Sequence, residues 1–144
     1  LYKHNGEDFK LLGRHSDNPI YNKRKKTSYP EGSGFIALGW QNGTFSIHDI
    51  PAWTNNGREY KSYVKSKCDI TDERLKSISM RSRSFYIYRF NNKEGDGKPY
   101  GIIVFERMSE KEIPVDFIKD IIEKHNKQIS NLLKSMKAFY KIED

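Results

Sequence analysis

The sequence of 144 residues is poor in cysteine and in long apolar stretches. Its one cysteine, Cys68, cannot form a disulfide within the chain. This excludes a disulfide-stapled scaffold and favours a reducing compartment, the cytoplasm. No run of about 18 apolar residues is present, so no membrane-spanning helix is expected. Contact with a membrane is expected only through segments outside this chain.

Catalytic and metal-binding spacings are also missing. The histidines are His4, His15, His48 and His125, and they form neither an H-x-x-x-H nor an H-E-x-x-H pattern. One cysteine cannot form a C-x-x-C pair. The sequence therefore predicts no metal site, no cofactor and no enzyme activity. Cys68 is interpreted as a partly buried thiol rather than as a nucleophile.

The chain is rich in charged and aromatic side chains. Lys and Arg number 26 against 19 Asp and Glu, which gives a net charge of +7, and aromatic residues make up 13% of the chain. The aromatic content favours a packed core over disorder, and the length fits one domain over residues 1–144. The basic excess fits an acidic partner or ligand, or simply a well-solvated surface.

Hydrophobic patterning divides the chain into short elements. Residues 1–12 are expected to form a hairpin, because Asn5-Gly6 lies between two apolar stretches. Residues 13–34 have the composition of a loop. Residues 35–40 fit a short helix or a buried strand, and the pattern leaves both open. Strands are predicted at residues 44–48, 84–90 and 100–106, and short helices at residues 56–68 and 70–79, the second of them capped by Thr71.

The clearest pattern lies at the end of the chain. Pro114 suits the first turn of a helix, and apolar residues then recur at steps of three and four, a stripe that includes His125. This predicts one amphipathic helix of about 25 residues, in which His125 is a core or interface residue. Such a helix is expected to extend beyond its sheet and to pair with a second copy of the chain. The predicted homodimer interface consists of Ile122, Ile129, Leu133 and Met136.

The order of these elements predicts an α+β fold. We expect a central antiparallel sheet of about five or six strands, with the long helix on one face and short helices and loops on the other. The strands at residues 85–90 and 100–105 are expected to be neighbours. The short segments on the second face are expected to leave a hollow.

Five segments of the chain resemble, in the same order, segments of the GAF domain family of small-molecule-sensing regulatory domains. They are residues 29–40 (YPEGSGFIALGW), 44–49 (TFSIHD), 80–88 (MRSRSFYIY), 101–105 (GIIVF) and the helix from Pro114. The resemblance implies a PAS- or profilin-like sheet and a last helix that joins a dimer interface. Because the usual first helix of the family is missing, it also implies that the chain begins inside the domain.

The chemical subtypes of that family do not match. The signature of cyclic-nucleotide-binding members is absent, since Asn92-Lys93-Glu94 falls in a glycine-rich turn. Bilin-binding members need a histidine beside the cysteine, but Asp69 follows Cys68. Methionine-sulfoxide-reductase members need several cysteines. The resemblance therefore implies a non-enzymatic sensory or scaffold domain.

The resemblance also implies a ligand pocket between the sheet and residues 50–80. Aromatic walls with a few polar groups suit a small ligand, although such rings can also simply fill the space. The pocket-lining residues that the resemblance implies are Asp49, Trp53, Tyr60 and Tyr63.

Two arginines precede the strand at residues 84–90. Arg81 and Arg83 are candidates to bind a ligand carboxylate or phosphate, because a guanidinium group forms paired hydrogen bonds with such anions. The alternative is that one of them holds a loop carbonyl or pairs with a carboxylate such as Asp49.

The leading expectation is a regulatory domain that binds a small molecule or a partner and signals through a helical dimer interface. The basic run Lys23-Arg24-Lys25-Lys26 supports an alternative, a nucleic-acid-binding module that contacts phosphates. Lys61, Lys65 and Lys67 would extend that basic side. A solvated loop is the simpler interpretation of the run, and attraction to an anionic membrane surface is a further alternative.

Overall fold

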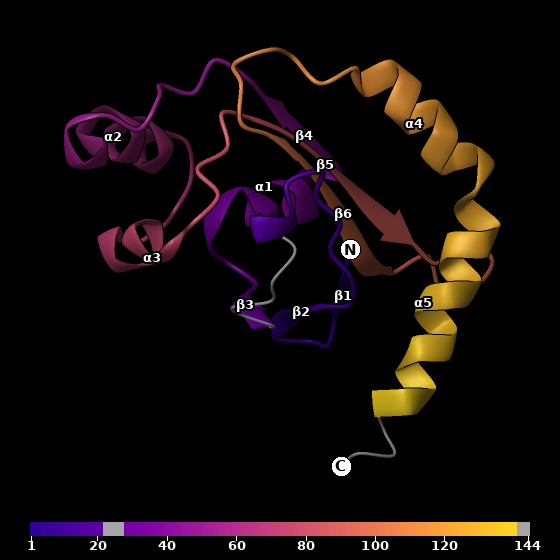
Figure 1. Ribbon diagram of the computed structural model, residues 1–144. Helices are drawn as coiled ribbons and strands as arrows, with labels where there is room; N and C mark the ends of the chain where they lie inside the picture. The colour runs from indigo at the N-terminus through magenta and orange to yellow at the C-terminus, as the bar shows by residue number, and fades with distance from the viewer. Residues whose placement is uncertain (22–27, 141–144) are drawn as a thin grey trace.

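The computed structural model describes residues 1–21 and 28–140, and the side chains of residues 1–21 and 28–136. Its centre is an antiparallel sheet of six strands in the order β3-β2-β1-β6-β5-β4 (Figure 1). The predicted α+β class with a central antiparallel sheet is confirmed. The strands are β1 (Tyr2–His4), β2 (Asp8–Leu11), β3 (Ser28–Pro30), β4 (Thr44–Ile47), β5 (Ser84–Asn91) and β6 (Pro99–Arg107).

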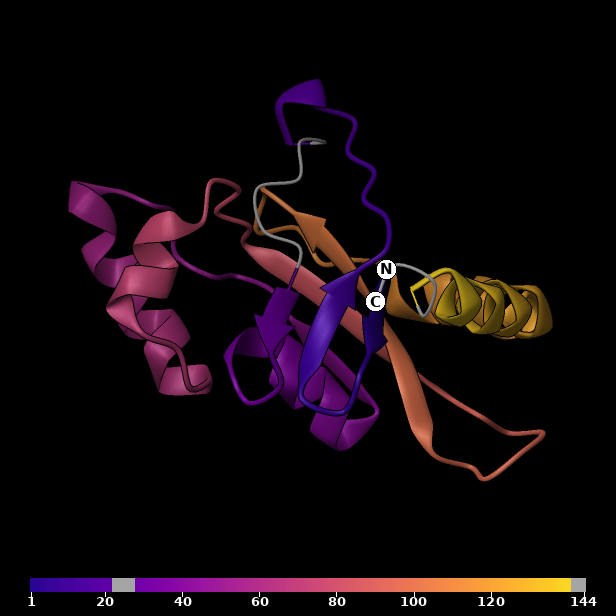
Figure 2. The same ribbon diagram turned by 90° about the horizontal axis from the view of Figure 1, so that it is seen from below.

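Helices cover both faces of the sheet (Figure 2). Three of them pack on the face that we call the α1–α3 face, and two on the opposite face, the α4–α5 face. None of the helices in the described ranges has both the length and the apolar character needed to cross a membrane. The helical segments are η1 (Pro19–Tyr21), α1 (Gly34–Asn42), η2 (Asn55–Gly57), α2 (Arg58–Lys67), α3 (Asp72–Ser77), α4 (Val115–Lys124) and α5 (Asn126–Tyr140).

The central strands β5 and β6 are neighbours, as predicted. Their register pairs Ile87 with Val104 and Tyr86 with Phe105. Because successive side chains of a strand point to opposite faces, Ile87 and Val104 join the core of the α1–α3 face, and Tyr86 and Phe105 join the other core. Both strands are therefore covered on both sides, which explains their nearly continuous apolar runs.

Helix α1 packs directly on the sheet and resolves the open interpretation of residues 35–40. A Cβ atom at Gly39 would lie 2.2 Å from Cγ2 of Ile87, so glycine is what allows this close approach. The helix ends at Gly43, whose φ of 88° suits a glycine C-cap. The buried core of this face consists of Phe9, Phe35, Trp40, Ile50, Tyr60, Val64, Leu75, Ile87 and Ile102.

The expectation of a loop over residues 13–34 is wrong at β3, and the same range contains the short helix η1 and the first residue of α1. Strand β3 pairs with β2, and Tyr29 lies opposite Phe9. Three residues carry too short a pattern to predict a strand, and this one forms because β2 offers a free edge. The predicted cap of α3 is confirmed, since the Thr71 hydroxyl accepts a hydrogen bond from the backbone N–H of Arg74 at 3.1 Å.

The expectation of one continuous C-terminal helix is also wrong. Helices α4 and α5 meet at His125, whose φ of −105° and ψ of 13° depart from helical values. The change of direction at this residue, visible in Figure 1, lets Ile122 in α4 and Leu133 in α5 both pack on the same face of the sheet. The side chain of His125 is exposed, so of the two roles predicted for it, core or interface residue, the core role is wrong.

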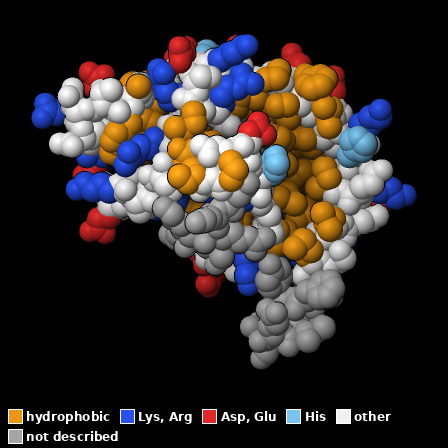
Figure 3. Space-filling view, in the orientation of Figure 1, with side chains coloured by type: hydrophobic (Ala, Val, Ile, Leu, Met, Phe, Trp, Pro, Cys, Tyr) orange, Lys and Arg blue, Asp and Glu red, His pale blue; other side chains and the backbone are white. Residues whose placement is uncertain are grey.

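The four side chains predicted at a homodimer interface pack against the sheet of their own chain. Ile122 and Leu133 are 4% and 0% exposed, and Ile129 and Met136 are half-buried in the same core. An apolar stripe covers either a sheet or a partner, and periodicity does not distinguish the two. Apolar side chains gather over α4 and along the inner side of α5 (Figure 3). Those most exposed on these two helices are Phe117, Ile121 and Leu132.

Candidate ligand-binding groove

A groove with a volume of about 1220 Å³ opens over the α1–α3 face of the sheet. Its walls come from β1, β3, the loop after β2, the start of α1 and helices α2 and α3, and strands β5 and β6 form its floor. The volume exceeds the range of about 300–1,000 Å³ that is usual for small-molecule sites, so the groove has room for an organic ligand. The hollow predicted on this face is present.

Most of the groove wall is apolar. The rings of Phe35 and Phe85 lie 5.0 Å apart between their centroids and form one side. Ile36 and Val64 extend this surface from α1 and α2. Such a wall favours the aromatic or aliphatic part of a ligand through burial of apolar surface.

A carboxylate stands on the floor of the groove. Along β6, Ile102 and Val104 face the α1–α3 side, and the alternation of the strand places Glu106 next in the same row. Ile102 is fully buried, whereas the side chain of Glu106 is open to the groove. A glutamate therefore occupies a position where the pattern of the strand calls for an apolar residue.

The surroundings of Glu106 disfavour its charge. The side chain of Glu106 is exposed to the groove, but the protein atoms around it partly desolvate the carboxyl, which raises the pKa of Glu106 above its ordinary value. The Arg14 guanidinium, the Ser82 hydroxyl and the amino group of Leu1 partly oppose the rise in pKa. Within the described part of the chain, Glu106 forms no ion pair.

Two tyrosines lie close to this carboxylate. Burial, with a further contribution from the charge of Glu106, raises the pKa of both Tyr2 and Tyr60. Both phenols therefore stay protonated at neutral pH. The Tyr60 hydroxyl donates a hydrogen bond of 2.9 Å to the backbone oxygen of Ser82, which ties α2 to the segment before β5.

The structure brings only Tyr60, among the pocket residues implied by the resemblance, into the groove. Asp49 is exposed beside His48, with 3.2 Å between Oδ2 and Nε2. Trp53 packs against Gly57, where a Cβ would lie 2.4 Å from the indole ring. The Tyr63 ring lies under Lys67, with 5.4 Å from Nζ to the ring centroid. The predicted set is corrected accordingly, because Asp49, Trp53 and Tyr63 lie outside the wall that faces the sheet.

The two candidate arginines also lie outside the groove. Arg83 donates from Nε to the backbone oxygen of Ile50 at 2.7 Å and pairs through Nη1 with Glu110 at 2.9 Å. This matches the structural alternative, with Glu110 as the carboxylate. The guanidinium of Arg81 lies 3.7 Å from the ring centroid of Trp53, a cation–π contact that holds residues 51–54 in place.

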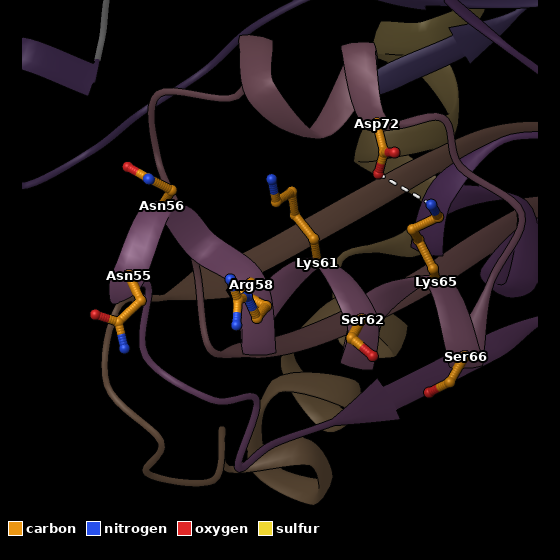
Figure 4. A pocket seen from close by; sticks show the side chains of 8 residues that line it. All are labelled: Asn55, Asn56, Arg58, Lys61, Ser62, Lys65, Ser66 and Asp72. Carbon is orange, nitrogen blue, oxygen red and sulfur yellow. Dashed lines mark hydrogen bonds and ion pairs between the residues drawn. The ribbon is translucent and has the colours of Figure 1, made fainter.

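A second, polar pocket of about 640 Å³ lies on the outer side of α2 (Figure 4). Arg58, Lys61 and Lys65 give it a positive character, and Lys65 pairs with Asp72 at 3.0 Å. Asn55 and its neighbours before α2 complete the wall. These side chains are largely solvated, so their attraction for an anion is screened by salt.

The described residues contain no group of three or more side chains that could hold a metal ion. The Cys68 thiol is half-buried and donates to the backbone oxygen of Val64 at 3.4 Å. Burial raises the pKa of Cys68 to about 11, so the thiol is neutral at physiological pH. This agrees with a buried structural thiol.

Comparisons of the chain with protein-family models, with curated proteins and with solved structures found no match. The resemblance to GAF domains therefore stays a prediction. The arguments for function that follow depend on the groove and its residues.

Proposed function

We propose that this chain is a non-enzymatic regulatory domain that binds a small organic molecule in the groove over the α1–α3 face. The observation that supports the proposal is the groove itself, about 1220 Å³ in volume, with apolar walls and, on its floor, a carboxylate that has no ion-pair partner among the described residues. Pockets with mostly apolar walls and a few polar groups are typical of small-molecule sites. Glu106 interrupts an otherwise apolar row of inward side chains on β6, and a binding role offers a reason for a charge at this position.

Helices α2 and α3 form the wall that a ligand would move. Both stand away from the sheet in Figure 1, and they reach it mainly through side chains such as Tyr60 and Leu75. A ligand that contacts this wall and the floor together would favour one arrangement of α2 and α3 over others.

Strand β6 offers a route from the groove to the opposite face. Val104 and Glu106 face the groove, whereas Ile103 and Phe105 pack in the core beneath α4 and α5. A shift of β6 on ligand binding would therefore change the packing of both α4 and α5. In this proposal α4 and α5 carry the signal, through a homodimer or to another part of the protein.

The proposal is tested by a thermal-shift screen of nucleotides, amino acids and amines. A ligand that binds only the folded state stabilises it by about 2.7 kcal/mol at one hundred times its Kd, so binding compounds raise the melting temperature. Ile36→Trp places an indole in the groove and should abolish the shift. The matched control, Ile121→Trp, makes the same change on the exposed outer side of α4 and should keep it.

Two results would contradict this function. One is that no compound of the screen stabilises the unmodified chain. The other is that stabilising compounds act equally on Ile36→Trp, which would place their site outside the groove.

The positive pocket beside α2 favours a second candidate function, binding of nucleic acid through phosphate contacts. The basic run at residues 23–26, on which the sequence argument rested, lies outside the described residues. Binding to a duplex or single strand should weaken steeply as salt rises. Replacing Lys61 and Lys65 with serine should weaken binding, whereas Lys119→Ser on α4 should not. Undetectable binding at low salt would exclude this function.

A further inference from the structure

We propose that the groove selects an apolar cation, an organic ammonium or amidinium group attached to an aromatic or aliphatic body, and that Glu106 pairs with the cationic end. The inference depends on the proposed function, because it names the ligand class of the same groove. It rests on a comparison of the described charged side chains around the groove, of which the arginines contact other groups and Glu106 forms no ion pair.

The arginines around the groove are each held by another group. Arg14 donates to Sδ of Met80 at 3.6 Å, and Arg107 donates to the backbone oxygen of Glu112 at 3.1 Å. The Arg74 guanidinium lies 4.8 Å from the ring centroid of Tyr29 and donates to Ser77. None of the three forms an ion pair with Glu106. Among the residues that the structure describes, Glu106 therefore has no ion-pair partner, and its carboxylate can pair with a cationic ligand in the groove.

The environment of Glu106 makes such a cation the most favourable ligand. The side chain of Glu106 is exposed to the groove, so a cationic group of a ligand there can reach the carboxylate and form a charge-assisted hydrogen bond with it. An anionic ligand would add a like charge in the same confined space. A neutral apolar ligand would displace water and leave the carboxylate unpaired, which is costly.

The rest of the groove fits the uncharged part of such a ligand. The apolar wall of Phe35, Ile36 and Phe85 lies in the same groove as Glu106. The rings of Tyr2 and Tyr60 line the groove and lie within electrostatic range of Glu106, and an aromatic face also attracts a cation. A ligand with a cation at one end and a ring at the other can therefore satisfy both parts of the site.

Three probes that share an indole ring separate charge from shape. Tryptamine carries an ammonium group, tryptophol a hydroxyl group and indole-3-acetate a carboxylate. Their Kd values are measured by isothermal titration calorimetry against the full chain, Glu106→Gln and the control Glu73→Gln. Glu73 lies exposed in the first turn of α3 and does not line the groove. Circular dichroism confirms that each variant is folded.

Tryptamine should bind the unmodified chain roughly tenfold or more tightly than the other two probes, the size expected of a charge-assisted hydrogen bond. Glu106→Gln should remove that advantage, and Glu73→Gln should leave it unchanged. Equal or tighter binding of tryptophol or indole-3-acetate would overturn the ligand class while leaving the groove as a binding site. Unchanged tryptamine affinity in Glu106→Gln would do the same.

Absence of binding by all three probes at millimolar concentration would also overturn the cation inference. The proposed function is judged separately, by the broad screen and the Ile36→Trp variant. The two proposals can therefore fail independently.

Discussion

The two faces of the sheet use the same strands in different ways. On the α4–α5 face, Tyr86, Phe90 and Leu133 close the space between sheet and helices with apolar contacts. On the α1–α3 face, α1 packs tightly at one end, but α2 and α3 leave a groove, and the row of inward side chains on β6 ends in Glu106. Alternate residues of one strand thus pack in a closed core on one side and line a groove on the other.

This difference between the two faces shows which part of a small domain can accommodate a binding site at little cost in stability. A closed core loses several kcal/mol when one side chain is shortened, whereas a groove wall tolerates changes because part of its surface already faces water. The comparison predicts a graded set of effects on stability, largest on the closed face.

The largest effect is expected for Leu133→Ala. This side chain of α5 is 0% exposed and packs between the helix and the sheet, so its truncation should destabilise the fold by about 2–5 kcal/mol. The neighbouring Leu132→Ala, at 51% exposure, should change stability by less than about 0.5 kcal/mol. Urea unfolding of both variants measures the contrast. Similar losses for the two would mean that α5 is not seated as described.

Gly39→Ala tests the tight end of the α1–α3 face. The added methyl group meets Cγ2 of Ile87 at 2.2 Å, so the strands or α1 must shift, at a cost of about 1–3 kcal/mol. Gly32→Ala is the control, because a Cβ at Gly32 meets no atom within 4 Å. A neutral Gly39→Ala would show that α1 is free to move away from the sheet.

A smaller effect is expected from the cap of α3, which forms part of the groove wall. Thr71→Ala removes the hydrogen bond to the N–H of Arg74 and should destabilise the protein by about 1 kcal/mol. Thr54 precedes η2, and its side chain makes no capping hydrogen bond. Thr54→Ala should therefore have little effect on stability. Equal losses in denaturant midpoint would argue against the cap.

The smallest expected effect is a gain in stability, in contrast to the losses predicted for the variants above. Because the folded-state pKa of Glu106 is raised, stability falls as pH rises from the ordinary glutamate value of about 4.3 through the raised value. At lower pH the carboxyl is protonated in both states and costs nothing. Glu106→Gln should therefore have a higher melting temperature than the unmodified chain at neutral pH and an equal one in acid. A lower melting temperature at neutral pH would indicate that the charge stabilises the fold.

Much of the sheet could be predicted from local signals. The hairpin at Asn5-Gly6, the alternation in residues 44–48 and the aromatic strand at residues 84–90 all have short-range causes, and the structure contains each of them. The Thr71 cap belongs to the same class. Strand β3 could not be predicted, because its three residues depend on pairing with β2.

The C-terminal region shows the limit of periodicity. The apolar steps continue through His125, so the pattern gives no sign of the bend between α4 and α5. Nor does it tell whether Ile122 and Leu133 meet a partner or their own sheet, which only the tertiary structure decides.

The site was predictable in place but not in composition. The resemblance implied a pocket between the sheet and residues 50–80, and Tyr60 lines the groove on that face. Trp53 does not, because its ring packs on Gly57 and Arg81. The sequence did carry a signal for Glu106, since the alternation of Ile102 and Val104 places it on the inward face.

The most direct test of this account is the titration of the Glu106 carboxyl carbon, followed by NMR in the free chain and with tryptamine. The account predicts a midpoint above the ordinary value of about 4.3 in the free chain, and a lower midpoint when the amine is bound. A midpoint in the free chain at or below the ordinary value would contradict it. That result would mean that the carboxylate is fully hydrated or already paired, and that the groove offers no place for a cation.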